Sequence, residues 1–350
     1  MDNKFDGSDL NLGADPFGTL PDGQRVSKYM LSNSNGMSVS VIDYGATITE
    51  LKIPTDRNGV DVVLGFDRIE DYVESVRLPA PPHFGAAIGR FAGRISNGRF
   101  SIGGETVQLD ANNGPNTLHG GKKGFDKVIW QVIAYSLNSI TLYYKSPDGD
   151  QHFPGELDVA VEYSLTDDNE LRIVYDAVSS KDTVINLTQH SYFNLDGQDG
   201  NVLEQDLMIN AGSILEIDDA NIPSGNRIKA ADKGFDFREF RKVPAKIDDS
   251  FLIEDTSVPA AQLRSEKTGI SLTVYSDQPS LHIYVGGNLF GQFKGKGGVA
   301  YQPHSGICFE SQNYTDAPNH PNFPSAVLRK GDRYTQKTIW KFEWQQSKRK

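Results

Sequence analysis

The chain has 350 residues, of which 37% are hydrophobic and 23% charged, a balance typical of a globular protein with a sizeable core. Its formal net charge of −11 argues against nucleic-acid partners, and no apolar run approaches the roughly 18 residues needed to cross a bilayer. The only cysteine, Cys308, cannot form an intrachain disulfide, and the polar N-terminal residues lack the apolar core of a signal peptide. We therefore expect a cytoplasmic protein without a membrane partner.

Apolar residues alternate with polar ones along several segments, which is the pattern of half-buried antiparallel strands. The clearest runs, in chain order, are 157–165, 171–177, 270–274 and 338–344. Turn signals such as those at 33–36 and 147–150 separate the predicted strands. The best helical pattern is short and covers 68–76. The sequence therefore predicts an all-β fold, a large antiparallel β-sandwich.

No internal repeat of fixed period and no low-complexity linker divides the chain. The glycine-rich stretch 286–298 has strand patterns on both sides, so we interpret it as a loop and not as a domain boundary. Residues 1–350 are therefore predicted to form a single domain.

Several common chemistries lack their sequence signals. There is no GxxxxGK[ST] phosphate loop and no GxSxG motif of a hydrolase. The seven histidines are widely separated, so we expect no metal and no cofactor, although a site built from three distant residues stays open. A glycoside-cleaving enzyme also stays open, because Asp248 and Glu310 could supply its two carboxylates.

Four polar clusters lie in or beside apolar strand patterns, where a buried charge is costly. They are GRFAGRI at 89–95, NTLHGG at 116–121, NLTQHSYFN at 186–194 and ICFESQ at 307–312. If 186–194 is one strand, Thr188, His190 and Tyr192 face the same side. The residues of most interest in the last cluster are Cys308, which we expect to be an inert buried thiol, and Glu310.

These clusters resemble the galactose mutarotase (aldose 1-epimerase) family, and the resemblance extends from about residue 17 to residue 342. It includes VVLGFD at 62–67 and SPDGDQHFPG at 146–155. The resemblance implies a large antiparallel β-sandwich, in agreement with the alternating pattern. It also implies an isomerase that interconverts the α and β anomers of free aldoses such as galactose or glucose, without a cofactor.

The resemblance implies a role for each of five residues. Glu310 would be the general base and His190 the general acid. Arg94 and His119 would hold sugar hydroxyls and the ring oxygen, and Asp248 would bind further hydroxyls. These residue types suit the reaction, because a carboxylate with an ordinary pKa of about 4.3 accepts a proton at neutral pH and an imidazole with an ordinary pKa of about 6.5 can donate one.

The chain departs from the family pattern at three places. Gly93 stands where an asparagine is usual, and His282 stands where a glutamine contacts the sugar. Asp248 is followed by Asp249 and Ser250 instead of His-Asn, so either aspartate could be the sugar-binding acid. A non-catalytic sugar-binding protein would keep the same pocket, and the sequence does not distinguish a monomer from a homodimer.

Overall fold

The computed structural model describes residues 13–55, 59–292 and 294–344. The polar N-terminal segment considered above lies outside these ranges. No helix within them is long and apolar enough to span a membrane.

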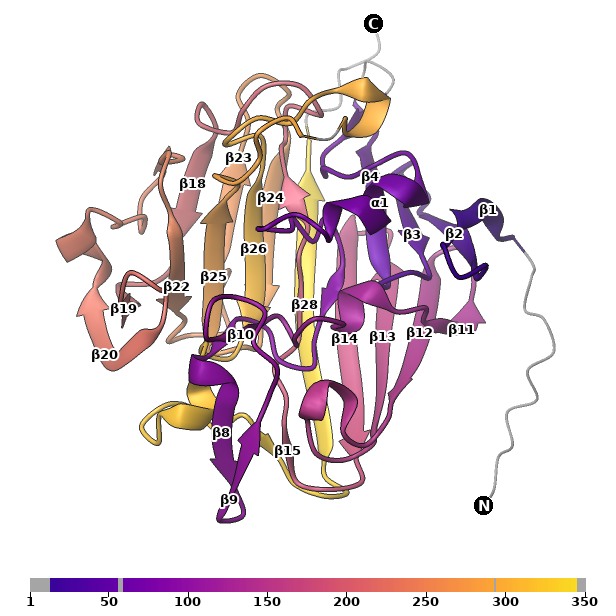
Figure 1. The fold of residues 1–350 in the computed structure, drawn as a ribbon. Coiled ribbons are helices and arrows are strands. Elements are labelled where there is room, and N and C mark those ends of the chain that lie inside the picture. The colour runs from indigo at the N-terminus through magenta and orange to yellow at the C-terminus, as the bar shows by residue number, and fades with distance from the viewer. Residues whose placement is uncertain (1–12, 56–58, 293, 345–350) are drawn as a thin grey trace, which may run out of the picture.

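A nine-stranded antiparallel sheet forms the larger layer of the molecule (Figure 1). In spatial order its strands are β11 (Gln131–Tyr135), β12 (Ser139–Ser146), β13 (Leu157–Leu165), β14 (Glu170–Ser179), β28 (Arg333–Glu343), β24 (Ser271–Ser276), β23 (Ala261–Arg264), β18 (Asp206–Ile209) and β21 (Arg241–Lys242). The predicted strands 157–165 and 171–177 are confirmed as β13 and within β14. The odd-numbered residues of β13, from Leu157 to Leu165, are all buried. This burial of alternate residues is the reason for the alternating apolar pattern in the sequence.

Two smaller antiparallel sheets form the other layer. The six-stranded sheet has the order β17 (Tyr192–Phe193), β26 (Ile307–Gln312), β25 (Ser280–Val285), β22 (Asp248–Leu252), β19 (Ser213–Ile217) and β20 (Pro223–Lys229). The five-stranded sheet has the order β1 (Asp15–Thr19), β2 (Arg25–Ser32), β3 (Ser38–Ile42), β4 (Thr47–Ile53) and β5 (Val60–Asp61). The glycine-rich stretch 286–298 connects β25 to β26, as predicted.

One hydrophobic core joins the three sheets. Its largest cluster contains Val39 from the five-stranded sheet, Tyr163 from the nine-stranded sheet and Phe309 from the six-stranded sheet. Phe193 and Trp340 meet in this core edge to face, with ring centroids 4.8 Å apart. The prediction of an all-β sandwich is therefore confirmed.

Short elements complete the chain. The single α-helix among the described residues, α1 (Ile69–Ser75), confirms the short helix predicted at 68–76 and buries Ile69 and Tyr72. The short strand pairs are β6 (Ala87–Ile88) with β16 (Thr188–Gln189), β7 (Arg94–Ile95) with β10 (Thr117–Leu118), β8 (Arg99–Ile102) with β9 (Glu105–Gln108), and β15 (Thr183–Val184) with β27 (Val327–Leu328). The 3₁₀ helices are η1 (Ser96–Gly98), η2 (Phe125–Lys127), η3 (Asp150–His152), η4 (Ala230–Lys233), η5 (Lys296–Gly298) and η6 (Ala317–Asn319).

Candidate active site

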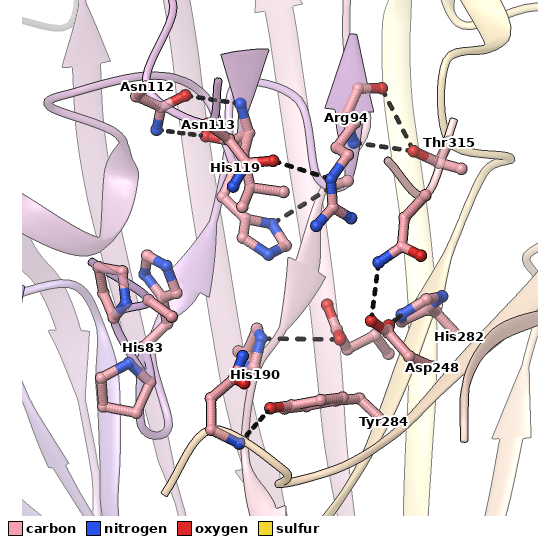
Figure 2. Close-up of a pocket in the computed structure, with 18 of the residues that line it drawn as sticks. His83, Arg94, Asn112, Asn113, His119, His190, Asp248, His282, Tyr284 and Thr315 are labelled. Atoms are coloured by element: carbon pink, nitrogen blue, oxygen red, sulfur yellow. Dashed lines mark hydrogen bonds and ion pairs between the residues drawn. The ribbon is translucent and has the colours of Figure 1, made fainter. Parts of the chain in front are cut away.

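A cavity of about 330 Å³ lies over one face of the six-stranded sheet, a size suited to a small ligand (Figure 2). All seven residues predicted to act on or bind a sugar line it, although they come from six separate parts of the chain. They are Gly93, Arg94, His119, His190, Asp248, His282 and Glu310. The structure thus brings the whole predicted set together.

The floor of the cavity follows from strand register. Ser250 of β22 pairs with His282 of β25, and His282 pairs with Glu310 of β26, so these three residues form a row across neighbouring strands. Alternate residues of a strand face the same side, and the intervening Ile283 and Phe309 point into the hydrophobic core. A one-residue slip of register would bury the polar row in that core, which fixes the register firmly.

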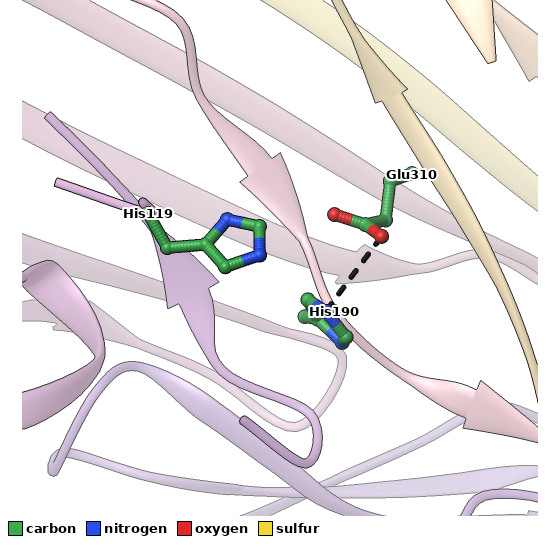
Figure 3. A group of neighbouring side chains, drawn as sticks. All are labelled: His119, His190 and Glu310. Carbon is green, nitrogen blue, oxygen red and sulfur yellow. Dashed lines mark ion pairs between the residues drawn. The ribbon is translucent and has the colours of Figure 1, made fainter. Parts of the chain in front are cut away.

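His190 and Glu310 face each other at the centre of the cavity. The Nε2 atom of His190 lies 3.6 Å from Oε1 of Glu310, and both side chains are almost fully buried (Figure 3). The other carboxylate oxygen of Glu310, Oε2, is buried without a hydrogen-bond partner. A buried carboxylate oxygen without a partner is costly, so this atom is a strong acceptor available to a ligand.

The backbone around His190 differs from the expected continuous strand. The segment forms β16 and β17, which are separated by His190 and Ser191, and the His190 amide donates to the Ala86 carbonyl at 3.0 Å. The interruption turns His190 into the cavity, which it lines together with Tyr192, while Thr188 does not line it. The segment pairs with β6 before the break and with β26 after it, and this change of partner strand is the physical reason for the break.

Burial moves the pKa values of the central pair toward the uncharged forms. It raises the pKa of Glu310 to about 7, partly offset by His282 and Arg94. It lowers the pKa of His190 to about 3, and the neighbouring His83 acts in the same direction. Near neutral pH, His190 is therefore neutral and Glu310 lies between its two protonation states.

His119 offers a hydrogen-bond donor to the cavity. Its Nδ1 atom accepts a hydrogen bond from the Gly93 amide at 3.3 Å, so in the neutral ring Nε2 carries the proton. Burial lowers the pKa of His119 well below its ordinary value, which keeps the ring neutral. The possible ligand atoms of His119, His190 and Glu310 lie within 4.8 Å of one another, a spacing that could hold a metal ion. A protonated Nε2 on His119 opposes coordination, in line with the expectation of no metal.

Gly93 and Arg94 are held in place by Thr315. Its Oγ1 atom accepts from the Arg94 amide at 2.8 Å, and the Arg94 Nε donates to Asn113 at 3.0 Å. Gly93 has a φ of +77°, and a Cβ there would lie 2.7 Å from Thr315 Oγ1. A larger residue therefore does not fit at Gly93 while Thr315 occupies this position.

Asp248, and not Asp249, faces the cavity. Asp248 accepts hydrogen bonds from Asn221 at 3.0 Å and from His282 Nε2 at 2.9 Å, whereas Asp249 pairs with Lys233 outside the cavity. Burial raises the pKa of Asp248, but the bond from His282 and its charge outweigh burial and hold the pKa below its ordinary value. The carboxylate is therefore ionised and keeps lone pairs for ligand hydroxyls.

His282 has no ring nitrogen left for a ligand. Its Nδ1 lies 2.9 Å from Ser250 Oγ, and its Nε2 is bound to Asp248. Burial lowers the pKa of His282, but the hydrogen bond and charge of Asp248 more than compensate, and the net pKa is raised. The expectation of a direct sugar contact through the ring nitrogens of His282 is therefore not supported by this geometry.

Other lining residues were not singled out from the sequence. They include His83, Asn113, Asn221, Tyr284, Asn288 and Gln312, of which Gln312 has a buried Oε1 without a hydrogen bond. Asn113 lies only three residues before the NTLHGG cluster, and Gln312 ends the ICFESQ cluster, so proximity to a motif was an available signal for these two. Tyr284 lies two residues after His282, and Asn288 lies in the glycine-rich stretch 286–298, whereas His83 and Asn221 lie in segments with no distinctive pattern.

Comparison with known proteins agrees with this arrangement. A family model described as aldose 1-epimerase matches residues 27–341. The chain belongs to the aldose 1-epimerase family. A galactose mutarotase of Mus musculus is 41% identical over 93% of this chain and 97% of its own length, and an aldose 1-epimerase of Escherichia coli K12 is 36% identical over 92% and 96%.

Solved structures of family members share the fold. An aldose epimerase homologue from C. elegans superposes with a TM-score of 0.85 at 30% identity, covering 91% of this chain and 99% of that one. A galactose 1-epimerase from Lactobacillus acidophilus superposes with a TM-score of 0.82 at 27% identity, covering 95% and 98%.

The buried Glu310 of this epimerase-family site is expected to lower stability at high pH. Its pKa is 4.5 when unperturbed and about 7 in the folded protein, so the neutral form is favoured by folding and its contribution is lost as the pH rises through about 7. Glu310→Gln stays neutral throughout. We expect its free energy of unfolding to exceed that of the wild type by roughly 3 kcal/mol near pH 8, and the gain to vanish toward about pH 4.5.

Urea denaturation of both proteins at several pH values measures this difference. The control is Glu74→Gln, which changes an exposed glutamate of α1 and is expected to show no such trend. An equal gain at every pH would contradict the pKa assignment.

Proposed function

We propose that this protein is an aldose 1-epimerase that interconverts the α and β anomers of free aldoses such as galactose or glucose. Glu310 is the general base and His190 the general acid. The observation that carries the proposal is the buried pair of His190 and Glu310, 3.6 Å apart, with an unpartnered Glu310 oxygen in a cavity of about 330 Å³. Membership of the aldose 1-epimerase family supports it.

Ring opening needs two proton transfers at neighbouring oxygens. Glu310 takes the proton of the anomeric O1 hydroxyl while His190 gives a proton to the ring oxygen O5, the C1–O5 bond breaks and an aldehyde forms at C1. Rotation about the C1–C2 bond then presents the other face of the aldehyde. Closure runs the same transfers in reverse and yields the opposite anomer, and each positioned transfer contributes about 10²–10⁴-fold to the rate.

The pair does this chemistry without changing its net charge. Before ring opening it consists of an ionised Glu310 and a protonated His190, and afterwards both side chains are neutral. A buried site stabilises a change of charge poorly, so a fixed total charge lowers the barrier. Burial favours the neutral form of the pair, because it raises the pKa of Glu310 to about 7 and lowers that of His190 to about 3, so forming the ionised pair before ring opening costs free energy.

The remaining polar groups hold the rest of the sugar during the rotation. Arg94 and the Nε2–H of His119 donate to sugar oxygens, and Asp248 accepts from sugar hydroxyls. His282 acts through Asp248, because both its nitrogens are engaged with protein groups. Fixed contacts of this kind confine movement to C1 and supply the orientation that the reaction requires.

A glycoside-cleaving role for Asp248 and Glu310 is less well supported. Both Asp248 oxygens accept hydrogen bonds from protein side chains, and Glu310 faces an imidazole instead of a second carboxylate. We further propose a cytoplasmic, single-domain protein, monomeric or homodimeric, that works on a monosaccharide without a resident cofactor.

Polarimetry of freshly dissolved α-D-galactose or α-D-glucose tests the proposal. We expect the protein to accelerate the approach to anomeric equilibrium, and Glu310→Gln and His190→Asn each to lower turnover by roughly two orders of magnitude or more. The control is His152→Asn, which changes an exposed histidine and is expected to keep full activity. No acceleration, with chromophore release from an aryl glycoside, would instead identify a glycosidase, and binding alone a sugar-binding protein.

The pH dependence of kcat/KM tests whether the active form of the Glu310–His190 pair holds one proton. The working pair holds one proton in total, and it loses that proton as the pH rises through the Glu310 pKa of about 7. We therefore expect kcat/KM to fall about tenfold per pH unit above that value and to be level just below it. A kcat/KM that increases as the pH rises through about 7 would show that the fully deprotonated pair is the active form.

A further inference from the structure

His83 lies beside the central pair but has no part in the chemistry described above. It lines the cavity and is mostly buried, with a side chain 8% exposed. Its ring centroid lies 5.1 Å from that of His119 and 5.7 Å from that of His190. Gly85 lies two residues after His83, and its backbone amide donates to the His190 carbonyl at 3.0 Å. His83 therefore belongs to the segment that also positions His190.

Asp126 fixes which nitrogen of His83 carries the proton. Nδ1 of His83 lies 2.8 Å from Oδ2 of Asp126. Burial raises the pKa of Asp126, but Lys127 and His83 outweigh burial and hold the pKa below its ordinary value. An ionised carboxylate only accepts hydrogen bonds, so Nδ1 is the donor. In the neutral ring, Nε2 of His83 is then left with a lone pair, as an acceptor.

The two neighbouring histidines therefore have opposite polarity. His119 receives a hydrogen bond at Nδ1 from the Gly93 amide, which leaves Nε2–H as a donor. His83 gives a hydrogen bond at Nδ1 to Asp126, which leaves Nε2 as an acceptor. Each polarity is set by a fixed protein partner, and both rings line the same cavity.

A hydroxyl group is the ligand group that satisfies such a pair, because it accepts and donates at the same time. A methoxy group accepts only, an ammonium donates only, and a deoxy position does neither. We propose that His83, held by Asp126, is a specificity-determining residue: it accepts a hydrogen bond from one sugar hydroxyl that itself accepts from His119. This inference rests on the proposed function and adds a residue that selects the substrate.

The protonated nitrogen of His83 can be observed directly. Long-range ¹H–¹⁵N spectra of the uniformly labelled protein distinguish the two neutral forms of each histidine. We expect His83 to carry its proton on Nδ1 and His119 on Nε2, with His83→Phe and His119→Phe used to assign the signals. A proton on Nε2 of His83 would overturn the proposal without reference to activity.

The 2-, 3-, 4- and 6-deoxy derivatives of galactose identify the hydroxyl. For the wild type we expect one of them to lose about tenfold or more in kcat/KM through the His83 contact. In His83→Phe we expect galactose itself to lose roughly 10- to 100-fold, and the additional loss for that one derivative to shrink to about threefold or less. The losses for the other three derivatives are expected to stay as in the wild type.

The matched control is His304→Phe. His304 also has a positive φ, +70° against +51° for His83, and does not line the cavity, so this variant carries the same backbone strain away from the site. It is expected to keep the wild-type pattern. The same pattern of losses in the wild type and His83→Phe would overturn the proposal.

Calorimetric binding of the same five sugars repeats the comparison without turnover. If the wild type binds sugars but does not interconvert their anomers, the proposed function fails while the binding pattern still decides the role of His83. Disappearance of one deoxy penalty in His83→Phe would support the role, and an unchanged pattern would reject it.

Discussion

The structure depends on the burial of one carboxylate beside one imidazole. Glu310 is 2% exposed and leaves one oxygen without a partner, an arrangement that costs stability in any folded protein. The surroundings limit this cost without removing it. Arg94 is positively charged, and the raised pKa of His282 favours its protonated, positive form. Both charges lower the pKa of Glu310 and so keep it near 7 instead of far above it. Burial of Glu310 thus lowers stability but provides a base whose pKa lies near neutral pH.

The sheet provides the rigidity that this buried base requires. Ser250, His282 and Glu310 form one row across three hydrogen-bonded strands, so their spacing is fixed by the backbone ladder. Arg94 lies in β7, and His119 directly follows β10, the strand that pairs with β7, on the other side of the cavity. The central pair is therefore held between a sheet and a short pair of strands, and the cavity needs no large motion to assemble it.

The fold was predictable from the sequence, and the structure brings the two predicted residues of the central pair together, for identifiable reasons. The period-two pattern of β13 reflects the burial of alternate residues, and Glu310 and His190 stood in long distinctive strings. Sequence reasoning failed where the cause lies outside the local segment. The break at His190 follows from the change of partner strand from β6 to β26, and the choice of Asp248 over Asp249 follows from which face of β22 meets the cavity. The role of His83 depends on Asp126, 43 residues away.

The partners of each histidine decide what the cavity can recognise. His119 and His83 each have one nitrogen bound to a protein group, which leaves one nitrogen of known polarity for a ligand. His282 has both nitrogens bound, so it orders Asp248 and contributes charge instead of a contact. In the proposed function, four histidines around one cavity therefore serve as donor, acceptor, positioning group and, in His190, proton carrier. The difference lies in the hydrogen bond on the far side of each ring, a feature that residue type alone does not reveal.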